Sequence, residues 1–285
     1  DRGDATRKRI RELQKEITSI GNEFDKNIRS DVRSVKVLAT ELDGLPADYI
    51  DAHPADEEGL ITITTDYPDI YPVMTYAHND ELRKRLRVAS RSRGYPANKL
   101  ILENLIAKRH ELASLLGFDS FASLSMSSQM IGSPEKAQSF LDSVGGALDK
   151  PVQEELDVFL SRLQEDNPSA RAVQVWQAGY IQNLLRKEQY ALDAQEVREY
   201  FRYENVRDGI FSLTEDLFDV EIKIWNTETW HEDVETFEII DNGKLLGRFY
   251  MDNHPRSDKY QHAAHWTLRS GIKDKRIPMS GLAQN

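Results

Sequence analysis

Thr236-Phe-Glu-Ile-Ile-Asp-Asn-Gly-Lys-Leu-Leu-Gly-Arg-Phe-Tyr-Met-Asp252 contains two apolar segments on either side of Asp241-Asn242-Gly243. Asn and Gly accept the positive φ angles of a tight hairpin turn, so this stretch predicts two antiparallel strands. A third segment, Tyr260-Gln-His-Ala-Ala-His-Trp-Thr-Leu268, has small residues at Ala263 and Ala264 and then strand formers. We therefore predict a small antiparallel β-sheet near the C-terminal end of the chain.

The third segment is the candidate for a peptide-binding element. A strand of small residues at a sheet edge leaves backbone N–H and C=O groups free to pair with an extended peptide. The alternative interpretation is a hairpin that only packs against helices. The residues of this segment do not by themselves decide between the two.

The chain before the sheet shows mostly helical periodicity. One apolar stripe with alternating spacings of three and four predicts a long first helix over residues 4–30; its members are Ile10, Leu13, Ile17, Ile20, Phe24 and Ile28. Asn79 and Ser133 are placed as helix N-caps, and Gly117 is placed to end a helix. Gly145-Gly146 and Pro151 are expected to kink or divide the helix that starts after Ser133. The order of elements predicts a mainly α architecture.

Composition excludes several classes of function. A formal net charge of −11 over 285 residues argues against a nucleic-acid partner, because phosphate backbones are bound by clustered Lys and Arg. No apolar run reaches membrane-spanning length, so no membrane association is expected. The chain has no cysteine and hence no thiol nucleophile and no Cys-based zinc site. We expect a cytosolic protein, although a cysteine-free chain is also compatible with a periplasm.

Two groups of ionisable residues are candidate sites. The basic run from Arg83 to Arg93 is interpreted as a solvated helix face rather than an anion site. His262 and His265 would share one face of a helix, but their neighbours favour a strand, in which positions three apart point to opposite faces. No zinc site is therefore predicted from this pair.

No motif of a known reaction is complete in the chain. There is no His-Glu-x-x-His, no nucleophile elbow, no phosphate-binding Gly loop and no dinucleotide fingerprint. Ser133 and Lys136 have the spacing of a Ser/Lys nucleophile pair, but they lie at a helix start where a capping role is expected. The residues alone indicate a helical protein and assign no catalytic residue.

Several ordered motifs, however, resemble those of one peptidase family. They are Lys108-Arg-His-Glu-Leu-Ala-Ser-Leu-Leu-Gly-Phe-Asp-Ser-Phe-Ala-Ser123, Ser133-Pro-Glu-Lys136, Leu185-Arg-Lys-Glu-Gln-Tyr-Ala-Leu-Asp193, Glu199-Tyr-Phe-Arg-Tyr-Glu-Asn-Val206, Trp230-His231 and Gly247-Arg-Phe-Tyr-Met-Asp252. In this order they resemble the thimet oligopeptidase, oligopeptidase A and peptidyl-dipeptidase family of zinc metallopeptidases, over nearly the whole chain. Gln177-Ala178-Gly179 and His262-Ala-Ala-His265 depart from the family pattern.

The resemblance implies a fold and a substrate. It implies one helical lobe of a zincin-type oligopeptidase, with residues 1–190 as channel wall and 191–285 as the start of a catalytic lobe. It also implies hydrolysis of short peptides by a zinc-activated water. The substrate-binding candidates are Tyr260, His262, Ala263 and Ala264, on the strand that would hold the substrate backbone.

The resemblance also implies that the zinc site lies elsewhere. In the family, the His-Glu-x-x-His helix follows the segment that matches Ile277–Asn285, so no catalytic residue and no metal ligand is assigned here. We expect the full-length parent to bind zinc and this chain alone to bind none, with the remaining catalytic part of the same protein as its partner. The alternative is a non-catalytic helical peptide-binding or scaffold protein. Whether the parent cleaves internally or releases dipeptides stays open.

Overall fold

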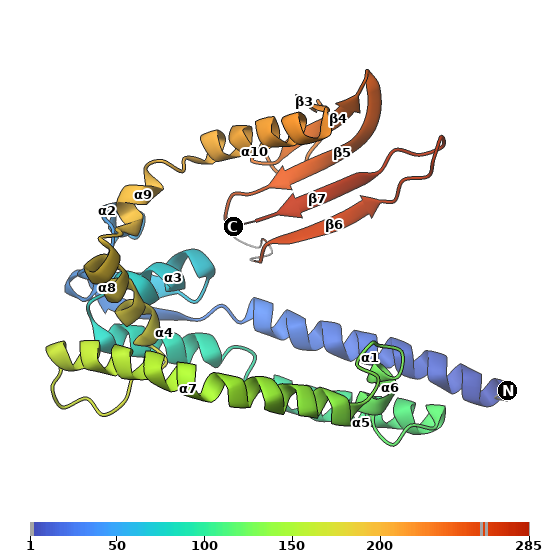
Figure 1. Ribbon diagram of the computed structural model, residues 1–285, viewed down its shortest axis with the longest axis horizontal. Coiled ribbons are helices and arrows are strands. Elements are labelled where there is room, and N and C mark those ends of the chain that lie inside the picture. Colours follow the sequence, from blue (N-terminus) through green and yellow to red (C-terminus); the bar gives the residue numbers. More distant parts are fainter. Residues whose placement is uncertain (1–2, 257–258, 260–261, 285) are drawn as a thin grey trace. The chain divides into compact units, whose positions relative to one another are not determined.

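The computed structural model describes residues 3–256, 259 and 262–284, and the predicted mainly α fold is confirmed (Figure 1). The chain divides into two compact units. The first contains the residues up to Thr65 together with Pro72–Leu185, and the second contains Asp66–Tyr71 and the chain from Arg186 onward. The predicted division into a channel wall and the start of a catalytic lobe stays a prediction.

The first unit is built on a pair of long helices. Helix α1 (Asp4–Ser30) has the bounds that its apolar stripe predicted, and it packs along α5 (Asn98–Leu116). Arg9 donates to both carboxylate oxygens of Glu111 at 2.7 and 2.9 Å, and Asn27 donates to Asn98 at 2.9 Å. Because polar contacts stand at both ends of the pair, they fix the alignment of the two helices.

The remaining elements up to residue 198 complete this unit and begin the second. They are β1 (Ser34–Leu38), the 3-10 helix η1 (Ala39–Leu42), α2 (Ala47–Asp51), β2 (Leu60–Thr64), α3 (Tyr67–Tyr76), α4 (Asp80–Arg91), α6 (Phe121–Met126), α7 (Pro134–Asp166), α8 (Ala178–Tyr190) and α9 (Ala194–Arg198). Strands β1 and β2 pair antiparallel. None of the helices in the described part of the chain has the length and apolar composition of a membrane span.

The predicted helix ends are confirmed. The side chain of Asn79 accepts from the backbone N–H of Leu82 at 3.0 Å, and Ser133 accepts from Lys136 at 3.3 Å. Gly117 takes the left-handed conformation at the end of α5, with φ of 85°. The Ser133 contact shows the hydroxyl acting as a helix cap.

The helices depart from the sequence prediction at two points. Helix α7 continues through Pro151 as one element of 33 residues, so the predicted division is wrong, and the predicted kink stays a prediction. The helix is not divided because losing one backbone donor does not outweigh the many bonds that remain on both sides. Arg83 is not on a solvated face: its side chain is 3% exposed, donates to Asp80 at 2.7 Å and lies over the ring of Tyr180 at 4.1 Å. The flat, charged guanidinium can be buried where a carboxylate and an aromatic face both receive it.

The second unit contains helix α10 (Tyr203–Phe218) and a five-stranded sheet. The strands are β3 (Glu221–Ile224), β4 (Glu235–Asp241), β5 (Lys244–Asp252), β6 (Ala264–Arg269) and β7 (Met279–Ala283), in the spatial order β3-β4-β5-β7-β6. Strand β7 pairs with β5 in parallel and with β6 antiparallel. The sheet is thus mixed, with a parallel pair in addition to the antiparallel pairs that the sequence predicts.

The predicted hairpin and its turn are present. Asn242 and Gly243 have φ angles of 47° and 77°, as a two-residue turn between β4 and β5 requires. Phe211 of α10 packs on the sheet against Phe237 and Phe249, with ring centroids 4.8 and 6.0 Å apart (Figure 1). This aromatic contact holds α10 on the face of β4 and β5.

The turn generates a stability prediction. A methyl group at Gly243 or at Gly209 of α10 would meet no atom within 4 Å, so the two sites differ only in backbone conformation. Gly243→Ala is expected to lower the free energy of unfolding by about 1 kcal/mol, because left-handed φ is unfavourable for Ala. Gly209→Ala is expected to raise it by about 1 kcal/mol, because Ala favours a helix. Urea unfolding of both variants measures the two changes in the free energy of unfolding. Two changes of the same sign would contradict the explanation.

Candidate functional site

Strand β6 lies at one end of the sheet. Its partner on one side is β7, with Ala264 opposite Ala283, and in the described part of the chain no strand lies on its other side. The backbone N–H and C=O groups on that outer side therefore do not take part in the sheet. Such an edge can accept an extended peptide as a further strand.

The predicted substrate-binding residues lie at the beginning of this strand. His262 and Ala263 precede β6 and are exposed, and Ala264 is its first residue. The imidazole of His262 contacts Tyr67 of the same unit, with Nε2 2.9 Å from the phenol oxygen. Tyr260 lies outside the described residues. Three of the four predicted residues are thus adjacent at the open edge, and their binding role stays a prediction.

A hollow of about 540 Å³ lies beside β6. Phe249, Leu282 and Pro278 form apolar parts of its wall, and β6 contributes His265 and Thr267. Gly271 brings its backbone close to Pro278, since a Cβ there would lie 3.2 Å from the proline ring. The hollow therefore offers space for an apolar side chain next to an open strand.

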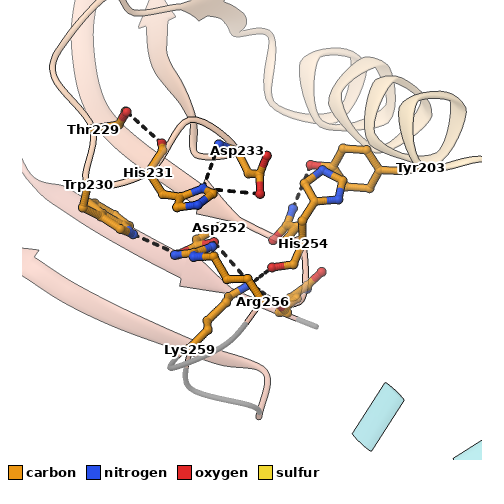
Figure 2. A network of polar contacts seen from close by, with 11 residues as sticks. Tyr203, Thr229, Trp230, His231, Asp233, Asp252, His254, Arg256 and Lys259 are labelled. Carbon is orange, nitrogen blue, oxygen red and sulfur yellow. Dashed lines mark hydrogen bonds and ion pairs between the residues drawn. The ribbon is translucent and has the colours of Figure 1, made fainter. Parts of the chain in front are cut away.

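At the end of β5, a buried carboxylate accepts from three donor residues (Figure 2). Asp252, the last residue of β5, accepts two bonds from Arg256 at 2.6 and 2.8 Å. It also accepts from the indole of Trp230 at 2.9 Å, and the ammonium of Lys259 lies 3.2 Å away. The hydrogen bonds from Arg256, together with those from Trp230 and Lys259, hold the pKa of Asp252 well below its usual range.

A second cluster lies where α10 meets the sheet. Tyr203 donates its hydroxyl to Glu235, which also accepts from Arg207, and Asn253 donates to the Tyr203 oxygen at 2.9 Å. Burial, reinforced by the bond to Glu235, raises the pKa of Tyr203 to about 12. The phenol therefore stays protonated at neutral pH, and its role is to join α10 to β4.

The loop before β4 carries Trp230 toward Asp252. The carbonyl of His231 accepts from Thr229 at 2.9 Å, and its ring Nδ1 accepts from the backbone N–H of Asp233 at 3.2 Å and lies 3.3 Å from the Asp233 carboxylate (Figure 2). These local bonds fix the loop and orient the indole. His231 acts here as a structural residue.

The described residues do not fit a zinc site. Among them, no group of three or more His, Asp or Glu side chains is placed so that it could hold a metal ion. His265 lines the hollow, whereas His262 contacts Tyr67. What the described residues offer instead is the outer edge of β6, which pairs with no further strand of the described sheet.

Sequence reasoning missed the Asp252 cluster. Asp252 and Arg256 are four residues apart and Lys259 follows, a spacing that fits one carboxylate and two cations. This spacing is weak evidence for a cluster, because charged residues after a strand are common and face water in most proteins. Only the burial of Asp252 and Lys259, with side chains 7% and 4% exposed, distinguishes this group.

Comparison with known proteins gives a consistent set of relatives. Peptidase family M3 matches residues 73–283. A thimet-like oligopeptidase of Dictyostelium discoideum is 30% identical over 98% of this chain and 44% of its own length. Saccharolysin of Saccharomyces cerevisiae is 30% identical over 94% of this chain and 40% of its own length. Oligopeptidase A of Escherichia coli is 28% identical over 88% of this chain and 39% of its own length. The chain spans about two fifths of the length of these curated relatives.

The Asp252 cluster generates a pH prediction. With the pKa of Asp252 lowered in the folded state, its stabilisation is complete above the pKa of an unfolded Asp, about 4, and declines as the pH falls below that value. Asp252→Asn is expected to cost about 3 kcal/mol at pH 7, because it leaves two cations without their carboxylate. The cost should shrink between pH 4 and pH 2.

Urea unfolding at pH 7 and pH 3, followed by tryptophan fluorescence, measures this change. Trp225, Trp230 and Trp266 all report on the second unit. Glu228→Gln, which neutralises an exposed carboxylate in the same unit, is the matched control and should change little at either pH. A cost for Asp252→Asn that stays constant with pH would contradict the role assigned to Asp252.

Proposed function

Because the chain belongs to peptidase family M3, we propose that it is part of a zinc-dependent oligopeptidase that hydrolyses peptide bonds in short peptides in the cytosol. The family match over residues 73–283 carries this proposal, and the names of the thimet-like oligopeptidase and oligopeptidase A relatives support it. In the proposal, this stretch supplies channel wall and a substrate-binding edge strand. The zinc ion and its ligands belong to the rest of the full-length protein, which is also the partner of this chain.

The edge strand is proposed to hold the peptide backbone. His262, Ala263 and Ala264 would lie along the bound peptide, with Tyr260 at the rim. The open side of β6 supports this role, and the small side chains of Ala263 and Ala264 would allow two backbones to approach within strand spacing, about 4.8 Å. Alternate side chains of the peptide would point toward the hollow beside β6.

This role predicts how larger side chains at the edge affect binding. Ala263→Ile or Ala264→Ile is expected to weaken binding of an acetylated, amidated hexapeptide by about ten-fold or more, because a branched side chain obstructs the approaching backbone. Titration of the isotope-labelled chain, followed by NMR shifts, measures the affinity. Ala147→Ile places the same change on the exposed face of α7 and should leave the affinity unchanged. If the unchanged chain shows no shifts, the scaffold alternative is favoured.

The assignment of the zinc site to the rest of the protein predicts the outcome of an activity assay. Incubated with zinc and an internally quenched fluorogenic peptide, the chain alone is expected to give no cleavage above the protein-free rate. Oligopeptidase A of Escherichia coli serves as the positive control under the same conditions. Cleavage that is abolished by a chelator and restored by zinc would contradict the assignment.

A further inference from the structure

Helix α3 carries two tyrosines in its first turns. Tyr67 and Tyr71 are one helical turn apart, and their rings contact each other with centroids 5.0 Å apart. Tyr71 is 59% exposed. It therefore presents an aromatic ring to solvent, with a second ring beside it.

The first of these tyrosines contacts the residue that leads into β6. The phenol oxygen of Tyr67 lies 2.9 Å from Nε2 and 3.2 Å from Nδ1 of His262, and the two rings meet edge to face with centroids 4.8 Å apart. The start of α3 and strand β6 belong to the same compact unit. His262 is separated from the first residue of β6, Ala264, only by Ala263. Tyr67, Tyr71 and His262 thus form an aromatic cluster next to the beginning of the open strand.

A peptide of six residues is longer than the regular part of this strand. The register against β7 is regular from Ala264 to Thr267, about 13 Å, whereas six extended residues span about 20 Å. Beyond Ala264, the chain continues to Ala263 and His262. A residue at that end of a bound peptide would therefore come next to the aromatic cluster.

The chemistry of the cluster favours an aromatic side chain. Aromatic rings attract one another in edge-to-face and offset arrangements, in addition to the apolar area that they bury. Tyr67 already has two ring neighbours, whereas much of Tyr71 is exposed and can receive a further ring. Neither tyrosine is among the described residues that line the hollow beside β6, so the cluster is a second, separate place for a peptide side chain.

We propose that the aromatic cluster is a binding site for a Phe, Tyr or Trp side chain at the end of the peptide that lies next to the start of β6. The inference rests on the proposed function, in which β6 holds the peptide backbone. Tyr71 contacts the aromatic side chain of the peptide, and Tyr67 supports Tyr71 from the side of His262. The cluster thereby determines which short peptides bind most tightly.

The test places a single Phe at each position in turn of a blocked hexapeptide of Thr and Ser. In the unchanged chain, Phe at one terminal position is expected to tighten binding about ten-fold relative to the peptide without Phe. Tyr71→Ala is expected to abolish this gain and to leave the affinity for the Phe-free peptide unchanged, because its backbone still pairs with β6. A gain from Phe at a position whose side chain enters the hollow should survive the substitution. NMR titration of the isotope-labelled chain measures each affinity.

Tyr200→Ala is the matched control, since Tyr200 is an exposed tyrosine of the same unit, and it should change none of these affinities. N-acetylphenylalaninamide, which is too short to pair along β6, provides a second measurement. It should shift the ring signals of Tyr71 in the unchanged chain and leave those of Tyr200 in place.

Two results would overturn the aromatic site: a terminal Phe that gives no gain or a gain that persists in the Tyr71→Ala variant, and ring signals of Tyr71 that the amide does not shift. If no hexapeptide binds while the amide still shifts Tyr71, the proposed function fails and the aromatic site stands.

Discussion

The position of β7 between β5 and β6 is the constraint on which the rest of the second unit depends. Parallel pairing with β5 and antiparallel pairing with β6 leave β6 as the last strand of the described sheet. The same arrangement brings the last residues of β5 and β7 and the first residue of β6 to one end of the sheet. At that end the ammonium of Lys259 donates to the carbonyls of His254 and Gln284 and lies 3.2 Å from the carboxylate of Asp252.

Burial and hydrogen bonding have opposite effects on the pKa of Asp252. One carboxylate faces two cations, and desolvation opposes the ionisation that the hydrogen bonds favour. The hydrogen bonds outweigh desolvation because the guanidinium of Arg256 donates through two nitrogens and the indole of Trp230 adds a neutral donor. Trp230 precedes His231, whose bonds fix the loop before β4, so this loop contributes a donor to Asp252.

Local chemistry allowed much of the fold to be predicted from sequence. The bounds of α1, the caps at Asn79 and Ser133 and the turn at Asn242 and Gly243 follow from spacing and backbone preference within a few residues. Strand β7 could not be found in this way, because Met-Ser-Gly-Leu-Ala has no β-branched or aromatic residue and owes its conformation to two neighbouring strands. Arg83 and Lys259 were missed for a related reason, since their burial depends on contacts between segments that lie apart in the chain.

The shape of β6 bears on how much peptide it could accommodate. Its register against β7 shifts between Thr267 and Arg269, so regular pairing geometry extends only from Ala264 to Thr267. Four residues at about 3.3 Å each give an edge of roughly 13 Å, enough for a short extended segment and too little for stable pairing with another whole sheet. The register shift thus limits the regular part of this open edge to the length of a short extended segment.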